Sequence, residues 1–115
     1  MSPQSTVGAV VPVTDGTFAD TVLSSDLPVL VDVWAAWCPP CAAIARGLAE
    51  LAGEFAGRAR IVAVDADENP QTILGYQIRA MPTLLLFRGG ELVGTVVGAR
   101  PKSALRDLLT NLVEA

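Results

Sequence analysis

Histidine is absent from this chain of 115 residues, aromatic residues make up 5% of it, and cysteine occurs only twice. The lack of histidine excludes a histidine base, a Ser-His-Asp or Cys-His nucleophile and a histidine metal ligand. The few basic residues are scattered and the net charge is −4, so no nucleic-acid surface is expected. Hydrophobic residues reach 51% against 17% charged ones, a balance that excludes intrinsic disorder.

Long hydrophobic runs are missing as well. The most apolar window, residues 29–45, is interrupted by Asp32 and by two adjacent prolines, whereas a membrane span needs about 20 apolar residues in a row. No Lys or Arg precedes a hydrophobic run at the N-terminus, so no secretory signal is indicated. We therefore expect a cytoplasmic protein with no membrane contact, built as one domain over residues 10–115 after a flexible tail over residues 1–9.

Hydrophobic periodicity predicts strands that alternate with helices. Strands are expected over residues 10–13, 29–34, 61–64, 83–87 and 92–97, and helices over 18–23, 39–55, 70–74 and from 101 onward. Asn69 is the expected N-cap of the short third helix, with Pro70 as its first residue. Gly89 and Gly90 suit a tight hairpin between the last two strands. The order β-α-β-α-β-α-β-β-α predicts an α/β fold with a mixed central sheet and helices on both faces.

Both cysteines lie in one motif, Trp37-Cys38-Pro39-Pro40-Cys41. A disulfide across so short a loop removes almost no chain entropy, which argues against a structural staple. Zinc needs about four ligands, and two sulfurs provide them only in a dimer or with added carboxylates. At the N-terminus of a helix, Cys38 would feel the positive end of the dipole, which lowers a thiol pKa. A reactive dithiol is therefore the leading interpretation, with an inert pair or a zinc-holding dimer as alternatives.

The chain resembles the thioredoxin family from about residue 10 to residue 113. The matching segments are Val31-Asp32-Val33-Trp34-Ala35, the Cys-x-x-Cys motif, Asp67-Glu68-Asn69-Pro70, Ile78-Arg79-Ala80-Met81-Pro82-Thr83 and Val97-Gly98-Ala99. The resemblance implies the thioredoxin fold and a protein-disulfide reductase that works by dithiol-disulfide exchange. It implies Cys38 as the attacking thiol and Cys41 as the more buried resolving thiol. Asp32, inside an apolar strand, would be a buried carboxylate that accepts a proton from Cys41; an acid at a strand end that reaches solvent is the alternative.

The resemblance also implies a cis peptide bond before Pro82 and an apolar docking rim around Cys38. The residues expected to shape or form this surface are Trp37, Pro39, Pro40, Ala66, Ala80, Met81, Pro82, Val97, Gly98 and Ala99. Four aromatic residues are interpreted as core alone, namely Phe18, Trp34, Phe55 and Phe87. Tyr76 is expected to pack near the site, and the acidic residues at 65–68 to form a solvated turn.

Three positions depart from the family pattern. Pro39 stands where the family commonly has glycine, and the second proline in a row changes the relative stability of dithiol and disulfide. Ala63 stands where the family often has a lysine near the buried carboxylate. The pKa of Asp32 is therefore expected to be set without that positive charge. Arg46-Gly47 replaces a proline that kinks the helix, so a straighter helix is expected, with Gly47 costing about 1 kcal/mol against alanine.

The resemblance implies a general reductase in electron transport, recharged by thioredoxin reductase with NADPH. No bound cofactor, metal or nucleic acid is expected, and a monomer is the default. Clients would be proteins with disulfides, such as ribonucleotide reductase, peroxiredoxin and methionine sulfoxide reductase. Two alternatives stay open: a reductase dedicated to one partner, of the cytochrome-maturation type, and a redox-inert binding module with the same fold.

Overall fold

A computed structural model describes residues 8–115, and its core is a five-stranded sheet in the order β1-β3-β2-β4-β5. The strands are β1 (Val11–Pro12), β2 (Val29–Trp34), β3 (Arg60–Asp65), β4 (Thr83–Arg88) and β5 (Glu91–Val97). The first three pair in parallel, whereas β4 and β5 are antiparallel to their neighbours. The predicted mixed sheet is thus confirmed; of the predicted tail, residues 1–7 lie outside the described residues.

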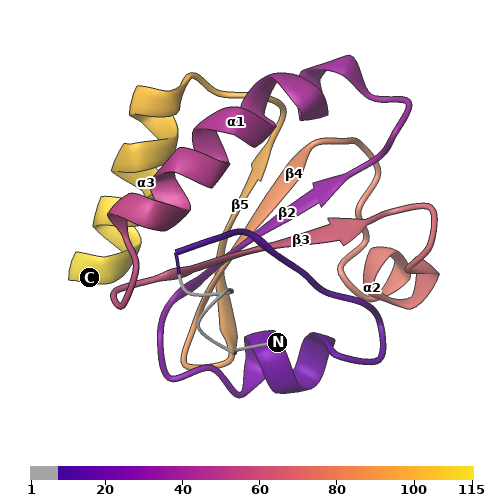
Figure 1. The fold of residues 1–115 in the computed structure, drawn as a ribbon. Helices are drawn as coiled ribbons and strands as arrows, with labels where there is room; N and C mark the ends of the chain where they lie inside the picture. The colour runs from indigo at the N-terminus through magenta and orange to yellow at the C-terminus, as the bar shows by residue number, and fades with distance from the viewer. Residues whose placement is uncertain (1–7) are drawn as a thin grey trace, which may run out of the picture.

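Helices cover both faces of the sheet, as Figure 1 shows. On one face lie α1 (Pro39–Glu54) and α3 (Lys102–Glu114), and on the other lie α2 (Pro70–Gly75) and the turn η2 (Ala19–Leu23). The predicted first helix is instead a single π-helical turn, in which the Ser24 N–H donates to the Ala19 carbonyl five residues earlier. In the part of the chain that the structure describes, no helix is long and apolar enough to span a membrane.

The central strand β2 is buried on both faces because the two helical layers enclose it. Alternate side chains point to opposite faces of a strand. Leu30 therefore joins the core under α1 and α3, whereas Val31 and Val33 join the core under α2 and η2. Asp32 has the same parity as Leu30, so a carboxylate points toward the α1 face of an otherwise apolar strand.

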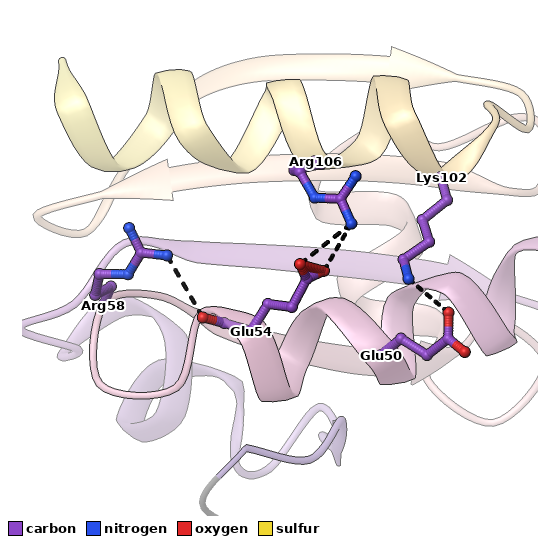
Figure 2. Close-up of polar contacts among 5 residues, drawn as sticks. All are labelled: Glu50, Glu54, Arg58, Lys102 and Arg106. Carbon is purple, nitrogen blue, oxygen red and sulfur yellow. Dashed lines mark hydrogen bonds and ion pairs between the residues drawn. The ribbon is translucent and has the colours of Figure 1, made fainter.

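Paired charges link the two helices on that face (Figure 2). Lys102 donates to Glu50 at 2.7 Å, and Arg106 donates to both oxygens of Glu54 at 2.9 and 3.1 Å. Surface pairs of this kind contribute little each, at most about 1 kcal/mol. Gly47 lies at the same contact, where an added Cβ would come within 3.5 Å of the Lys102 side chain, an ordinary van der Waals distance. Gly47, one of the two residues that stand in place of the kinking proline, thus lies where α1 and α3 approach closely.

The start of α2 differs from the prediction. Asn69 occupies the N-cap, but its side chain accepts from the Asp15 N–H and donates to the Asp65 carbonyl instead of capping the helix. Asp15 takes over the cap, since its two oxygens accept from the N–H groups of Thr72 and Gln71 at 2.9 and 3.1 Å. Desolvation acts to raise the pKa of Asp15, but a hydrogen bond from the Thr72 hydroxyl and the two from backbone N–H groups outweigh it, so the pKa is lowered. A residue 56 and 57 positions away from its two partners therefore caps the N-terminus of α2.

Candidate active site

Cys38 and Cys41 form a disulfide at the N-terminus of α1, directly after the carboxyl end of β2. Their Cα atoms lie 5.3 Å apart. Cys38 is the N-cap in extended conformation, and Pro39 and Pro40 fill the first two helical positions, where a missing N–H costs nothing. The first N–H of the helix is therefore that of Cys41, and it donates to Cys38 Sγ at 3.2 Å.

The two sulfur positions differ in backbone setting more than in burial. Cys38 is 6% exposed and Cys41 is 4% exposed. Cys41 is therefore only slightly more buried than Cys38. Only Cys38 stands outside the helix, with its sulfur at the positive end of the dipole and in contact with a backbone N–H. Both features stabilise a thiolate, so the geometry favours Cys38 as the attacking group when the disulfide is open.

Asp32 is 5% exposed, which excludes the alternative of an acid that reaches solvent at a strand end. Among the described residues, its Oδ1 is the one buried side-chain oxygen or nitrogen without a hydrogen-bond partner. Burial raises the pKa of Asp32 from 3.8 to about 7, because a carboxylate loses its hydration in an apolar setting. The side chain lines a cavity of about 480 Å³ whose wall also includes Cys38 and Cys41. A group that titrates near neutrality thus shares a cavity with the disulfide.

Trp37 is the exposed aromatic residue next to the cysteines, with 64% of its surface accessible. Its indole N–H donates to Asp67 Oδ2 at 3.0 Å, and the Asp67 N–H in turn donates to Asp65 Oδ1. The acidic turn therefore does more than face solvent, because it fixes the orientation of Trp37. Sequence reasoning missed this role, and no local signal connects two residues 30 positions apart.

The Met81–Pro82 peptide bond is cis, as the resemblance implies. Met81 packs against the cluster that Ala35 forms with the two cysteines. The Pro82 carbonyl accepts the Gly98 N–H at 2.8 Å, which brings the end of β5 beside this segment. The Thr83 hydroxyl stabilises the turn around the cis peptide bond by donating to the Ala80 carbonyl at 2.6 Å.

Most of the predicted rim is accessible to a partner. Ala80, Val97 and Ala99 are exposed, and Met81, Ala66 and Gly98 are half-buried. The Ala66 N–H donates to the Trp34 carbonyl at 2.8 Å, at the end of β2 that precedes the cysteines. The docking role of these residues stays a prediction.

Two aromatic assignments need correction. Trp34 is half-buried rather than core alone, since it packs against the cysteine cluster and lines the cavity beside Asp32. Tyr76 does not pack at the disulfide: its ring lies 5.5 Å from that of Phe18 and 5.6 Å from that of Phe87. Phe87 pairs with Val29 at the start of β2, and the cysteines follow the other end of that strand. Phe18, Phe55 and Phe87 are buried as predicted.

Over residues 8–115, no three His, Cys, Asp or Glu side chains gather in a way that could hold a metal ion. The chemistry that the described groups offer is a reversible disulfide, one carboxyl that exchanges a proton near neutral pH, and an accessible apolar surface around them.

Comparisons with known proteins agree with this geometry. The model of the thioredoxin family matches residues 9–111. Thioredoxin 1 of Nostoc sp. is 48% identical over 103 residues, which cover 90% of this chain and 96% of the relative. Thioredoxin of Synechocystis sp. is 46% identical over 97 residues, covering 84% and 91%, and that of Haemophilus influenzae is 45% identical over 100 residues, covering 87% and 94%.

Proposed function

Because the chain belongs to the thioredoxin family and is a thiol-disulfide oxidoreductase that reduces protein disulfides, we propose that Cys38 is its nucleophile and Cys41 its resolving thiol. The observation that carries this order is the hydrogen bond from the Cys41 N–H to Cys38 Sγ at the N-cap of α1. A donor at this point and the positive end of the helix dipole both favour the thiolate of Cys38 over that of Cys41.

The reaction begins with the reduced dithiol. The Cys38 thiolate attacks one sulfur of the substrate disulfide, and the other substrate sulfur leaves as a thiolate that takes a proton from water. Cys41 then loses its proton and attacks Cys38 Sγ in the mixed disulfide, which releases the second substrate sulfur. The substrate gains two electrons, and the same two electrons leave the protein as the Cys38–Cys41 disulfide forms.

Asp32 is proposed as the acceptor of the Cys41 proton. Both residues line one cavity, so a water molecule in it provides a path between thiol and carboxylate. A base works best when its pKa lies near the working pH, and burial raises the pKa of Asp32 to about 7. Ala63, the β3 register partner of Asp32, offers no charge that would lower this value.

Substrates are proposed to dock on the rim formed by Trp37, Met81 and the segment 97–99. The half-buried Met81 lies against the cysteine cluster, next to the cis peptide bond. Apolar side chains there provide affinity without a sequence requirement, which suits a reductase that acts on many proteins.

The proposed partners are a thioredoxin reductase that draws on NADPH and client proteins with exposed disulfides. Ribonucleotide reductase, peroxiredoxin and methionine sulfoxide reductase are the client classes we expect. The chain is proposed to act as a cytoplasmic monomer whose redox group is its own disulfide, with no bound cofactor. The names of the thioredoxin relatives support a general reductase over a dedicated one.

Two single-cysteine variants test the order of attack with a generic disulfide protein such as insulin. We expect Cys41→Ser to form a stable mixed disulfide with the substrate through Cys38, and Cys38→Ser to form none. Both variants should lose turnover. A mixed disulfide that accumulates in Cys38→Ser would reverse the assignment. Poor reduction of insulin by the unaltered protein, together with capture of a single cellular partner by Cys41→Ser, would favour the dedicated reductase.

A further inference from the structure

The cavity beside Asp32 has the volume of a small-molecule site. Its volume of about 480 Å³ falls within the range of ligand sites, roughly 300–1,000 Å³. For comparison, an engineered apolar cavity of about 150 Å³ holds a benzene molecule. The cavity therefore has room for an aromatic or cyclic group with a substituent.

Small side chains produce this space. Ala63 on β3 is the register partner of both Asp32 on β2 and Pro12 on β1, so these three lie side by side on the face below α1. Ala45 and Ala49 of α1 also line the cavity. Pro12, Ala45 and Ala49 are exposed, so the opening to solvent lies between β1 and α1.

The wall combines an apolar surface with a single charge. Asp32 is the one charged residue among the described residues that line the cavity, and its buried Oδ1 has no partner. The neighbours of Asp32 among the described residues include no second titratable group. They are Ala63 on β3, Leu84 on β4, and Leu48 and the disulfide-bonded Cys41 on α1. A buried carboxylate oxygen of this kind favours a donor, and a charged donor most of all.

We propose that this cavity is a binding site for small apolar molecules that carry a protonated amine. The apolar part would fill the space between α1 and the sheet, and the ammonium group would donate to Asp32 Oδ1. Such an occupant satisfies the unpartnered oxygen and removes apolar wall from water at the same time. The residues proposed to dock substrate (Trp37, Met81 and 97–99) do not line this cavity, although Cys38 borders both.

Benzylamine is the probe, since it stays protonated over the range tested and its ring fits the volume. It is titrated into the oxidised protein and followed by amide shifts in two-dimensional NMR. We expect saturable shifts at Ala45 and Ala63, with an affinity about tenfold or more higher near pH 8 than near pH 5.5, because protonation of Asp32 removes its charge. Benzyl alcohol, which has the same shape without the charge, should bind about tenfold more weakly.

Three variants locate the site. Asp32→Asn should weaken benzylamine binding by about tenfold or more. Ala49→Leu, which fills the opening, should also weaken binding, whereas Ala43→Leu should not, because Ala43 is also exposed on α1 but does not line the cavity. The NMR spectrum of each variant shows directly whether it is folded.

The proposal is overturned if benzylamine causes no saturable shifts near pH 8, which would mean that water alone occupies the cavity. Equal binding of benzyl alcohol, or unchanged binding to Asp32→Asn, would also overturn it, because the carboxylate would then play no part. The oxidised protein is used without any disulfide substrate, so these outcomes are independent of the order of attack at Cys38 and Cys41.

Discussion

The buried carboxyl of Asp32 predicts an unusual dependence of stability on pH. Its pKa is 3.8 in the unfolded chain and is raised to about 7 in the folded protein. Between these values the unfolded chain has lost the proton while the folded protein keeps it, so the folded state binds more protons. The free energy of unfolding therefore falls as the pH rises through this window. The contribution is fully present below the lower pKa and is gone above the upper one.

The magnitude follows from the size of the shift. One pKa unit corresponds to about 1.36 kcal/mol, and the pKa of Asp32 rises from 3.8 to about 7. The protein should thus lose about 4 kcal/mol of stability between about pH 4 and about pH 8.5 through this group alone. Asp32→Asn removes the titration but leaves the other carboxyl groups in place. The difference between the two proteins should therefore change by about 4 kcal/mol in favour of the variant.

Urea unfolding of the oxidised proteins, followed by tryptophan fluorescence at several pH values, measures this difference. The disulfide stays closed throughout, so no thiol titrates in the same window. Asp107→Asn is the matched control, since Asp107 is an exposed carboxylate on α3, and its curve should run parallel to that of the unaltered protein. If the gap between Asp32→Asn and the unaltered protein changes by less than about 1 kcal/mol over this range, the reasoning about burial is wrong.

Three further predictions concern stability and the site. Gly47→Ala should stabilise the protein by about 0.5–1 kcal/mol in urea unfolding, because α3 leaves ordinary contact distance for the added methyl group; a loss of stability would show that the helices cannot adjust. Gly90→Ala should destabilise it, since its φ is +81° and the Cβ would lie 2.7 Å from the Leu23 carbonyl oxygen. Asp67→Ala should change the Trp37 fluorescence but alter stability by less than about 1 kcal/mol, because the bond that it removes is exposed; an unchanged spectrum would argue against this contact in solution.

Much of the fold could be predicted from local pattern. The β-branched run at 29–34 forms β2 with the predicted bounds, and the three-and-four spacing after Cys41 forms α1. Gly89 and Gly90 adopt the positive φ values of a tight hairpin, 61° and 81°. In these segments the conformation that the local sequence favours is also the one that the tertiary contacts stabilise. The secondary structure can therefore be predicted from neighbouring residues.

The capping of α2 and the packing of Tyr76 could not be predicted, because both depend on contacts between residues far apart in the sequence. Asn69 stands at the predicted N-cap, yet Asp15 makes the capping bonds from 56 and 57 positions away. Tyr76 follows a helix whose end was predicted, but its ring joins Phe18 and Phe87. In both cases several residues could make the contact, and the fold decides which of them comes close enough. The residues next to Asn69 and Tyr76 in the sequence do not contain this information.

The reactive groups can be identified from the order of the residues: two cysteines at the start of a helix, an acid inside an apolar strand, and a proline that precedes the fourth strand. The motif order alone indicated the family. The surroundings of these groups depend on the folded arrangement of the strands and helices. The contact between Trp37 and Asp67, the unpartnered oxygen of Asp32 and the cavity beside it all depend on the pairing of β1, β3 and β2 below α1. Burial and long-range contacts exist only once the chain has folded, and they set the pKa of Asp32 and the space next to the disulfide.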